Sequence, residues 1–165
     1  MRRGTLYLIP VPLGVMPAVE SLPAAVCAQA AGLRYFIAEN AKSARAFLKS
    51  LPSRIPLQDI SIRELNEHTS PAVWHERLAP LLAGSDVGLI SEAGCPAVAD
   101  PGAELVALAQ AQGIRVVPLI GPSSILLALM ASGLGGQHFA FHGYLPAKED
   151  ARNQAIATLE KDSRA

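Results

Sequence analysis

The chain has 165 residues, enough for one domain with a sizeable buried core. Its 14 basic and 14 acidic residues balance, so net charge gives no case for nucleic-acid binding, although a local basic patch is compatible with it. Cys27 and Cys95 form neither a CxxC pair nor a metal-ligand spacing, which indicates a reduced cytoplasmic protein without a metal site. No apolar run reaches the roughly 18 residues of a membrane span, so no membrane partner is expected.

Strand-like and helix-like segments alternate along the chain. The pattern predicts strands at residues 5–11, 35–38, 59–65, 86–90, 114–120 and 139–144, separated by helices at residues 18–31, 42–51, 71–82, 103–111, 123–132 and 149–161. Alternation of this kind predicts an α/β fold, with a mostly parallel sheet of about five strands and helices on both faces. We expect residues 1–146 to form an N-terminal cofactor- and substrate-binding domain. Residues 147–165 are expected to be a linker and the start of a second domain that this chain lacks.

Three loops rich in glycine and proline follow predicted strands, at residues 9–15, 91–102 and 119–124. Open α/β sheets bind ligands at the carboxyl ends of their strands, which is where these loops would lie. None contains GxxxxGK[ST] or GxGxxG, the patterns that hold phosphate groups. The loops therefore favour a ligand approached by backbone atoms, and S-adenosylmethionine fits, because its carboxylate suits a helix start and its adenine suits an apolar slot.

Four segments together resemble the signature blocks of the tetrapyrrole methylase superfamily. They are LIPVPLG at residues 8–14, SEAGCP with DPG at residues 91–102, PLIGPSS at residues 118–124 and GYLPAK at residues 143–148. Their order and spacing match over nearly the whole chain. The closest branch is the one that contains the 16S ribosomal RNA 2′-O-ribose methyltransferase I.

The resemblance implies a methyltransferase that uses S-adenosylmethionine, bound in the cleft between two α/β domains of a homodimer. It also implies cytoplasmic rRNA processing, with S-adenosylmethionine or S-adenosylhomocysteine and ribosomal RNA as partners. By the same resemblance, the cofactor site would be lined by Pro12, Gly14, Ser91, Glu92, Ala93, Gly94, Val98, Ser123 and Ser124.

The chain departs from the pattern of the ribosomal RNA members after the second predicted strand. Those members carry an acidic pair followed by Thr-Arg, whereas residues 39–42 here are Glu-Asn-Ala-Lys, and Val15 replaces the usual asparagine of the first loop. These differences indicate a divergent paralogue. Glu39 is the candidate catalytic base, since a carboxylate can accept the proton of a hydroxyl acceptor, and a loop cap or substrate contact is its alternative role.

The sequence leaves the methyl acceptor open. A basic groove beside the three loops would favour RNA, and an apolar trough would favour a flat tetrapyrrole or another small molecule. The altered residues 39–42 are also compatible with a non-catalytic module that binds a nucleotide-like ligand or a protein partner.

Overall fold

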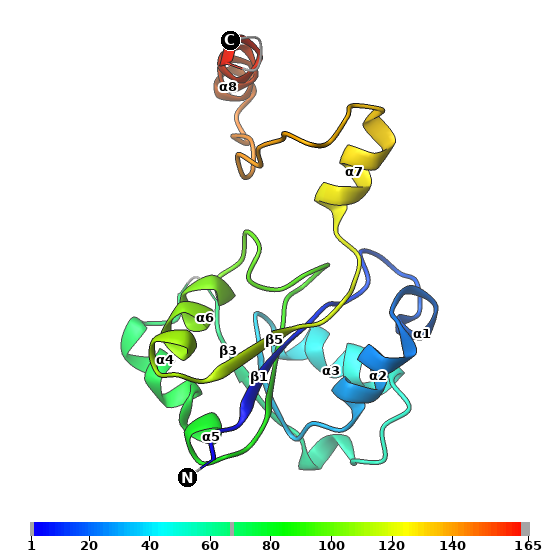
Figure 1. Ribbon diagram of the computed structural model, residues 1–165, viewed down its shortest axis with the longest axis vertical. Coiled ribbons are helices and arrows are strands. Elements are labelled where there is room, and N and C mark those ends of the chain that lie inside the picture. The colour runs from blue at the N-terminus through cyan, green and yellow to red at the C-terminus, as the bar shows by residue number, and fades with distance from the viewer. Residues whose placement is uncertain (1, 67, 163–165) are drawn as a thin grey trace. The chain divides into compact units, whose positions relative to one another are not determined.

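The structure, a computed structural model, describes residues 2–66 and 68–162. Its centre is a sheet of five parallel strands in the order β3-β2-β4-β1-β5 (Figure 1). The strands are β1 (Thr5–Ile9), β2 (Tyr35–Ala38), β3 (Ser61–Glu64), β4 (Val87–Ile90) and β5 (Arg115–Pro118). The predicted α/β fold with a parallel sheet of about five strands is confirmed.

Helices cover both faces of this sheet. On one face lie α1 (Ala18–Ser21), α2 (Ala24–Ala31) and α3 (Ala41–Ser50), and on the other lie α4 (Pro71–Arg77), α5 (Ala79–Leu82) and α6 (Gly102–Ala111) (Figure 1). A short 3-10 helix, η1 (Leu57–Asp59), precedes β3. Successive strand residues alternate between the two layers, so that Phe36 packs under α2 and α3 while Ile37 packs under α5 and α6.

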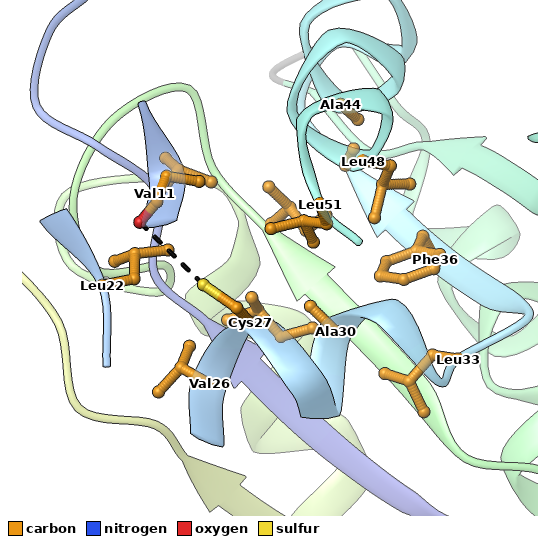
Figure 2. Packing of buried hydrophobic residues seen from close by; sticks show 14 residues of the cluster. Val11, Leu22, Val26, Cys27, Ala30, Leu33, Phe36, Ala44, Leu48 and Leu51 are labelled. Carbon is orange, nitrogen blue, oxygen red and sulfur yellow. Dashed lines mark hydrogen bonds between the residues drawn. The ribbon is translucent and has the colours of Figure 1, made fainter. Parts of the chain in front are cut away.

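The layer beneath α2 and α3 is a dense apolar cluster (Figure 2). Phe36 is 1% exposed and packs among side chains of both helices, including Cys27 and Leu48. Gly88 of β4 lies beside Phe36, and a Cβ there would come within 2.7 Å of the Phe36 ring and 2.6 Å of the Ile9 side chain. The cluster therefore leaves no room for a larger residue at position 88.

Prolines divide two of the predicted helices. The helix expected over residues 18–31 is two helices, because Leu22 is extended before Pro23, whose ring disfavours the helical conformation of the preceding residue. The helix expected over residues 71–82 is likewise divided into α4 and α5, and Pro80 lies in the first turn of α5, where its missing N–H costs little.

The connections create a switch point at the centre of the sheet. Strands β1 and β4 are neighbours, yet the chain passes from β1 to the α1–α3 layer and from β4 to the α6 layer. Loops that leave adjacent parallel strands toward opposite faces open a crevice at the carboxyl ends of those strands, where α/β proteins bind ligands.

The chain divides into two compact units, the first ending at Ser132. The first unit ends with α7 (Ser124–Ser132), and the second contains an irregular stretch followed by α8 (Glu149–Asp162). The strand predicted at residues 139–144 is wrong: these residues have no regular structure, since an apolar stretch forms a strand only when it finds a ladder partner. Within residues 2–66 and 68–162, no helix is long and apolar enough to cross a bilayer.

Candidate functional site

Three loops at the carboxyl ends of the strands are bonded to one another. We name them the β1 loop (residues 10–17), the β4 loop (residues 91–101) and the β5 loop (residues 119–123). Val11 and Gly94 join the first two loops through a pair of backbone hydrogen bonds, with N···O distances of 2.9 and 3.1 Å. Gly94 has a φ of +70°, and a Cβ there would lie 3.1 Å from the Leu13 side chain, so glycine suits this junction.

The β5 loop is attached to both of the others. The Cys95 thiol of the β4 loop lies 3.4 Å from the carbonyl oxygen of Pro122 and donates to it. Gly121 packs directly on Pro10, where a Cβ would come within 2.2 Å of the proline ring. The three loops therefore form one continuous platform.

Asp100 organises the second half of the β4 loop. Its carboxylate accepts hydrogen bonds from the backbone N–H of Ala97, at 2.9 Å, and of Gly102, at 2.7 Å. Ala97 and Ala99 have φ values of +63° and +56°, in the left-handed region that residues other than glycine seldom adopt. The loop thus holds two strained alanines, and the Asp100 carboxylate bonds the first of them directly.

Burial also affects the ionisable groups of the β4 loop. Desolvation raises the pKa of Asp100 above its ordinary value of 3.8, hydrogen bonds from Gly102 and Ala97 oppose this, and the charge of Glu104 adds to the increase. Desolvation likewise raises the pKa of the Cys95 thiol. A thiol with a raised pKa is protonated at neutral pH and a poor nucleophile, so Cys95 serves here as a hydrogen-bond donor.

Helix α3 begins beside the β4 loop, and polar side chains hold its first turn. The Asn40 side chain accepts hydrogen bonds from the N–H groups of Lys42 and Ser43, at 2.8 and 3.3 Å, as an N-cap residue does. Glu64 accepts a hydrogen bond from the N–H of Ala41 at 2.9 Å. The Ser43 hydroxyl donates to the Glu92 carboxylate, which links α3 to the β4 loop.

A groove of about 310 Å³ runs between these elements. Its walls come from the β1 loop and the start of α1, from α3, and from the end of β4 with the start of its loop. The lining residues are Val11, Pro12, Gly14, Val15, Met16, Pro17, Ala18, Ser43, Phe47, Ser50, Ile90, Ser91 and Glu92. Four of the residues expected at the cofactor site therefore border one groove: Pro12, Gly14, Ser91 and Glu92.

The other expected residues lie elsewhere on the same edge. Ala93 is in the β4 loop, where its carbonyl lies 3.3 Å from the Ser91 hydroxyl, and Gly94 holds the junction with the β1 loop. Val98 is half exposed near the middle of the β4 loop. Ser123 closes the β5 loop and Ser124 begins α7.

Glu39 does not border the groove. It follows β2, its N–H donates to Ile90 at 3.3 Å, and it lines a small hollow of about 10 Å³ together with Ser91 and Asp100. A space of this size holds about one water molecule. Glu39 is thus next to the β4 loop and outside the lining of the groove.

The groove residues that the sequence did not predict include three on α3: Ser43, Phe47 and Ser50. Their spacing of four and three residues places them on one side of the helix, and this periodicity was the available signal. The same periodicity occurs on any half-buried helix face. Only the position of the β1 loop beside this side of α3 identifies it as a groove wall.

The fold and the loops define a class of protein. This is a parallel α/β domain with joined, glycine- and proline-rich loops at its topological switch point, the place where α/β proteins bind ligands. Backbone groups dominate the platform, and no lysine or arginine is among the described residues that line the groove.

Comparison with known proteins finds similar chains, although no family model matches. It is 32% identical over 165 residues to the ribosomal RNA small subunit methyltransferase I of Xylella fastidiosa, an alignment that covers 98% of this chain and 56% of that protein. The proteins of the same name from Escherichia coli O157:H7 and Synechocystis are 33% and 34% identical, with 98% of this chain aligned in each case.

The chain is similar to these small-subunit methyltransferases over nearly its whole length, which confirms the resemblance drawn from the four signature blocks. It spans about half the length of the curated relatives it matches, since the alignments cover 56, 54 and 55% of the three proteins.

Proposed function

We propose that this chain carries the cofactor-binding platform of an S-adenosylmethionine-dependent methyltransferase that acts on ribosomal RNA of the small subunit. The observation that carries the proposal is the joining of three strand-end loops at the switch point, through Val11, Gly94, Cys95 and Pro122. The names of the relatives support the reaction and the acceptor.

The residues present fit such a cofactor. Backbone groups of the β1 and β4 loops would meet its polar edges, Val98 and Pro12 offer apolar surface, and the start of α7 at Ser123 and Ser124 offers N–H groups to its carboxylate. When bound, the cofactor supplies an activated methyl group. The platform holds the donor in place so that an acceptor can approach in line, which is how positioning accelerates a displacement.

Calorimetric titration with S-adenosylhomocysteine tests the cofactor site. We expect saturable one-to-one binding by the chain, and weaker binding by Gly94→Ala, because the added Cβ presses on Leu13 and Pro122 at the loop junction. Gly133→Ala is the matched control: Gly133 has the same φ of +70°, but open space surrounds its Cβ position. No binding by folded wild-type chain, or equal losses in both variants, would contradict the proposed site.

Glu39 is the group that we assign to accepting the proton of the acceptor hydroxyl, which in the ribosomal RNA reaction is a ribose 2′-hydroxyl. Its position beside Ser91 and Asp100, next to the β4 loop, supports this role. Glu39→Gln should reduce methyl transfer by at least about a hundredfold and leave S-adenosylhomocysteine affinity within about twofold, as expected for a base that acts only in the transition state. A parallel loss of cofactor affinity would instead identify Glu39 as a structural residue.

A small-molecule acceptor such as a tetrapyrrole is a second candidate, and one observation favours it. The groove beside the loops is lined mainly by apolar groups, and Glu92 is the only ionisable side chain among its described lining residues. Competing methylation assays with small-subunit ribosomal RNA and with a tetrapyrrole decide between the acceptors. Cofactor binding without transfer to either would favour a non-catalytic module.

Self-association and cytoplasmic location complete the proposal. The side chains of Leu126, Leu127 and Met130 on helix α7 are each at least half exposed. This supports a homodimer, because exposed apolar surface is typical of protein–protein contacts. Sedimentation equilibrium should show a dimer, and Met130→Lys should shift it toward monomer. A monomeric wild-type chain would contradict the proposed dimer.

The proposed cytoplasmic location is supported by the proposed acceptor, ribosomal RNA.

A further inference from the structure

Helix α3 is locally basic in a chain whose overall charge is balanced. Its ten residues include three basic ones, Lys42, Arg45 and Lys49, and no acidic one. All three are exposed, and their spacing of three and four residues places them along one side of the helix. In the described part of the chain, none of the three forms an ion pair.

The core contacts of α3 explain why the side with the three basic residues is exposed to solvent. Ala44 and Leu48 point into the apolar cluster above β2 (Figure 2), and Lys42, Arg45 and Lys49 lie on a different, exposed side of the helix. The carboxylates of Glu64 and Glu92 accept hydrogen bonds from Ala41 and Ser43 in the first turn of α3. Arg45 and Lys49 are further along the helix.

A third side of α3 forms one wall of the groove. Ser43, Phe47 and Ser50 line it, and Val15 and Met16 of the β1 loop, which are 106% and 56% exposed, stand at the opposite wall. Its volume of about 310 Å³ is at the lower end of the range of about 300–1,000 Å³ for small-molecule sites. An aromatic ring, apolar neighbours and two hydroxyl groups suit the face and edges of a nucleobase.

We propose that α3 is an RNA-binding element of this protein. Phosphates of a single strand lie along Lys42, Arg45 and Lys49, and one unpaired nucleotide enters the groove with its base against Phe47. The inference rests on the proposed function for its choice of RNA. It explains how an acceptor groove without a lysine or arginine in its described lining could serve a polyanion, because the charge contacts lie outside the groove on the same helix.

The charge contacts are tested by fluorescence anisotropy with a labelled single-stranded RNA dodecamer. The variant K42Q/R45Q/K49Q should bind at least about tenfold more weakly at low salt. Its log–log salt slope should fall by about 2, for three lost contacts at roughly 0.7 each on a single strand. The matched control, R34Q/R54Q/R115Q, removes the same charge from exposed arginines outside α3.

We expect the control to retain wild-type affinity and salt dependence. Equal losses in the two triple variants, or an unchanged slope in the α3 variant, would overturn the proposal, because binding would then follow net charge alone. Thermal unfolding of each variant establishes that any loss occurs in folded protein.

The base contact is tested separately with 2-aminopurine placed in the dodecamer. Stacking on Phe47 should quench the fluorescence of one position, and Phe47→Leu should remove that quenching while leaving the salt slope unchanged. Quenching that survives in Phe47→Leu would place the base elsewhere and overturn this part.

Titration with S-adenosylhomocysteine separates this proposal from the proposed function. If wild-type chain binds the cofactor but the α3 variant binds RNA like wild type, α3 is not the RNA element and the methyltransferase proposal stands. If RNA binding depends on α3 while wild-type chain binds no cofactor, the RNA-binding inference stands and the methyltransferase proposal fails.

Discussion

The Ser43 hydroxyl donates a hydrogen bond to the Glu92 carboxylate and thereby ties the first turn of α3 to the β4 loop. The two residues are 49 positions apart in the chain, and each borders the groove. The link places a carboxylate at the N-terminus of a helix, where the helix dipole favours negative charge. It also joins the helix that we assign to RNA with the loop that we assign to the cofactor.

Ser43→Ala should lower the free energy of unfolding by about 1 kcal/mol, because the Glu92 carboxylate loses a donor and the two elements lose a link. Ser50→Ala is the control, since the Ser50 hydroxyl donates only within α3, to the Phe47 carbonyl. Urea unfolding measures both variants. Equal effects would show that the link between α3 and the β4 loop contributes nothing to stability.

Asp100→Ala should destabilise the protein by about 2 kcal/mol, because it leaves the N–H groups of Ala97 and Gly102 without their acceptor in a partly buried loop. Asp59→Ala, at an exposed aspartate in η1, should change stability by less than about 0.5 kcal/mol. Cofactor affinity should fall with Asp100→Ala alone. Retained stability and affinity would show that the β4 loop keeps its shape without this carboxylate.

The raised pKa of Asp100 predicts a pH dependence of stability. A carboxyl whose pKa is higher in the folded than in the unfolded state binds more protons when folded, so its contribution to stability is complete below the unfolded value. That contribution is lost as pH rises from about 3.8 through the folded pKa. Wild type should therefore lose stability relative to Asp100→Asn over this interval, as chemical unfolding at several pH values would show. A wild type that gains stability relative to the variant as pH rises would mean that the hydrogen bonds outweigh desolvation.

Ala97→Gly and Ala99→Gly should each be neutral or stabilising by up to about 1 kcal/mol, because both alanines have positive φ and glycine relieves the strain. The control is Ala107→Gly, at an exposed site within α6, which should destabilise by about 1 kcal/mol. Thermal unfolding compares the three. Losses of equal size at all three positions would show that the backbone of the β4 loop stores no strain.

Local signals predicted much of the fold. Apolar runs such as residues 86–90 formed buried strands, and Gly113 and Gly133, which lie just past helix ends, have the positive φ typical of helix termination. The errors have local causes too: Pro23 and Pro80 divide helices whose apolar periodicity continues across them. Residues 139–144 look like a strand by composition, but β structure depends on a partner that composition does not reveal.

By itself, the sequence determined where the glycine, proline and hydroxyl residues cluster after apolar strands, and it therefore predicted which segments form the ligand site. Only the tertiary structure decided which of these residues meet. The pairing of β1 with β4 brings Val11 to Gly94, and the crossing of the β1 loop turns one side of α3 into a groove wall. Such contacts join residues tens of positions apart, and no local pattern encodes them, since they arise from strand order and from how helices pack on the sheet.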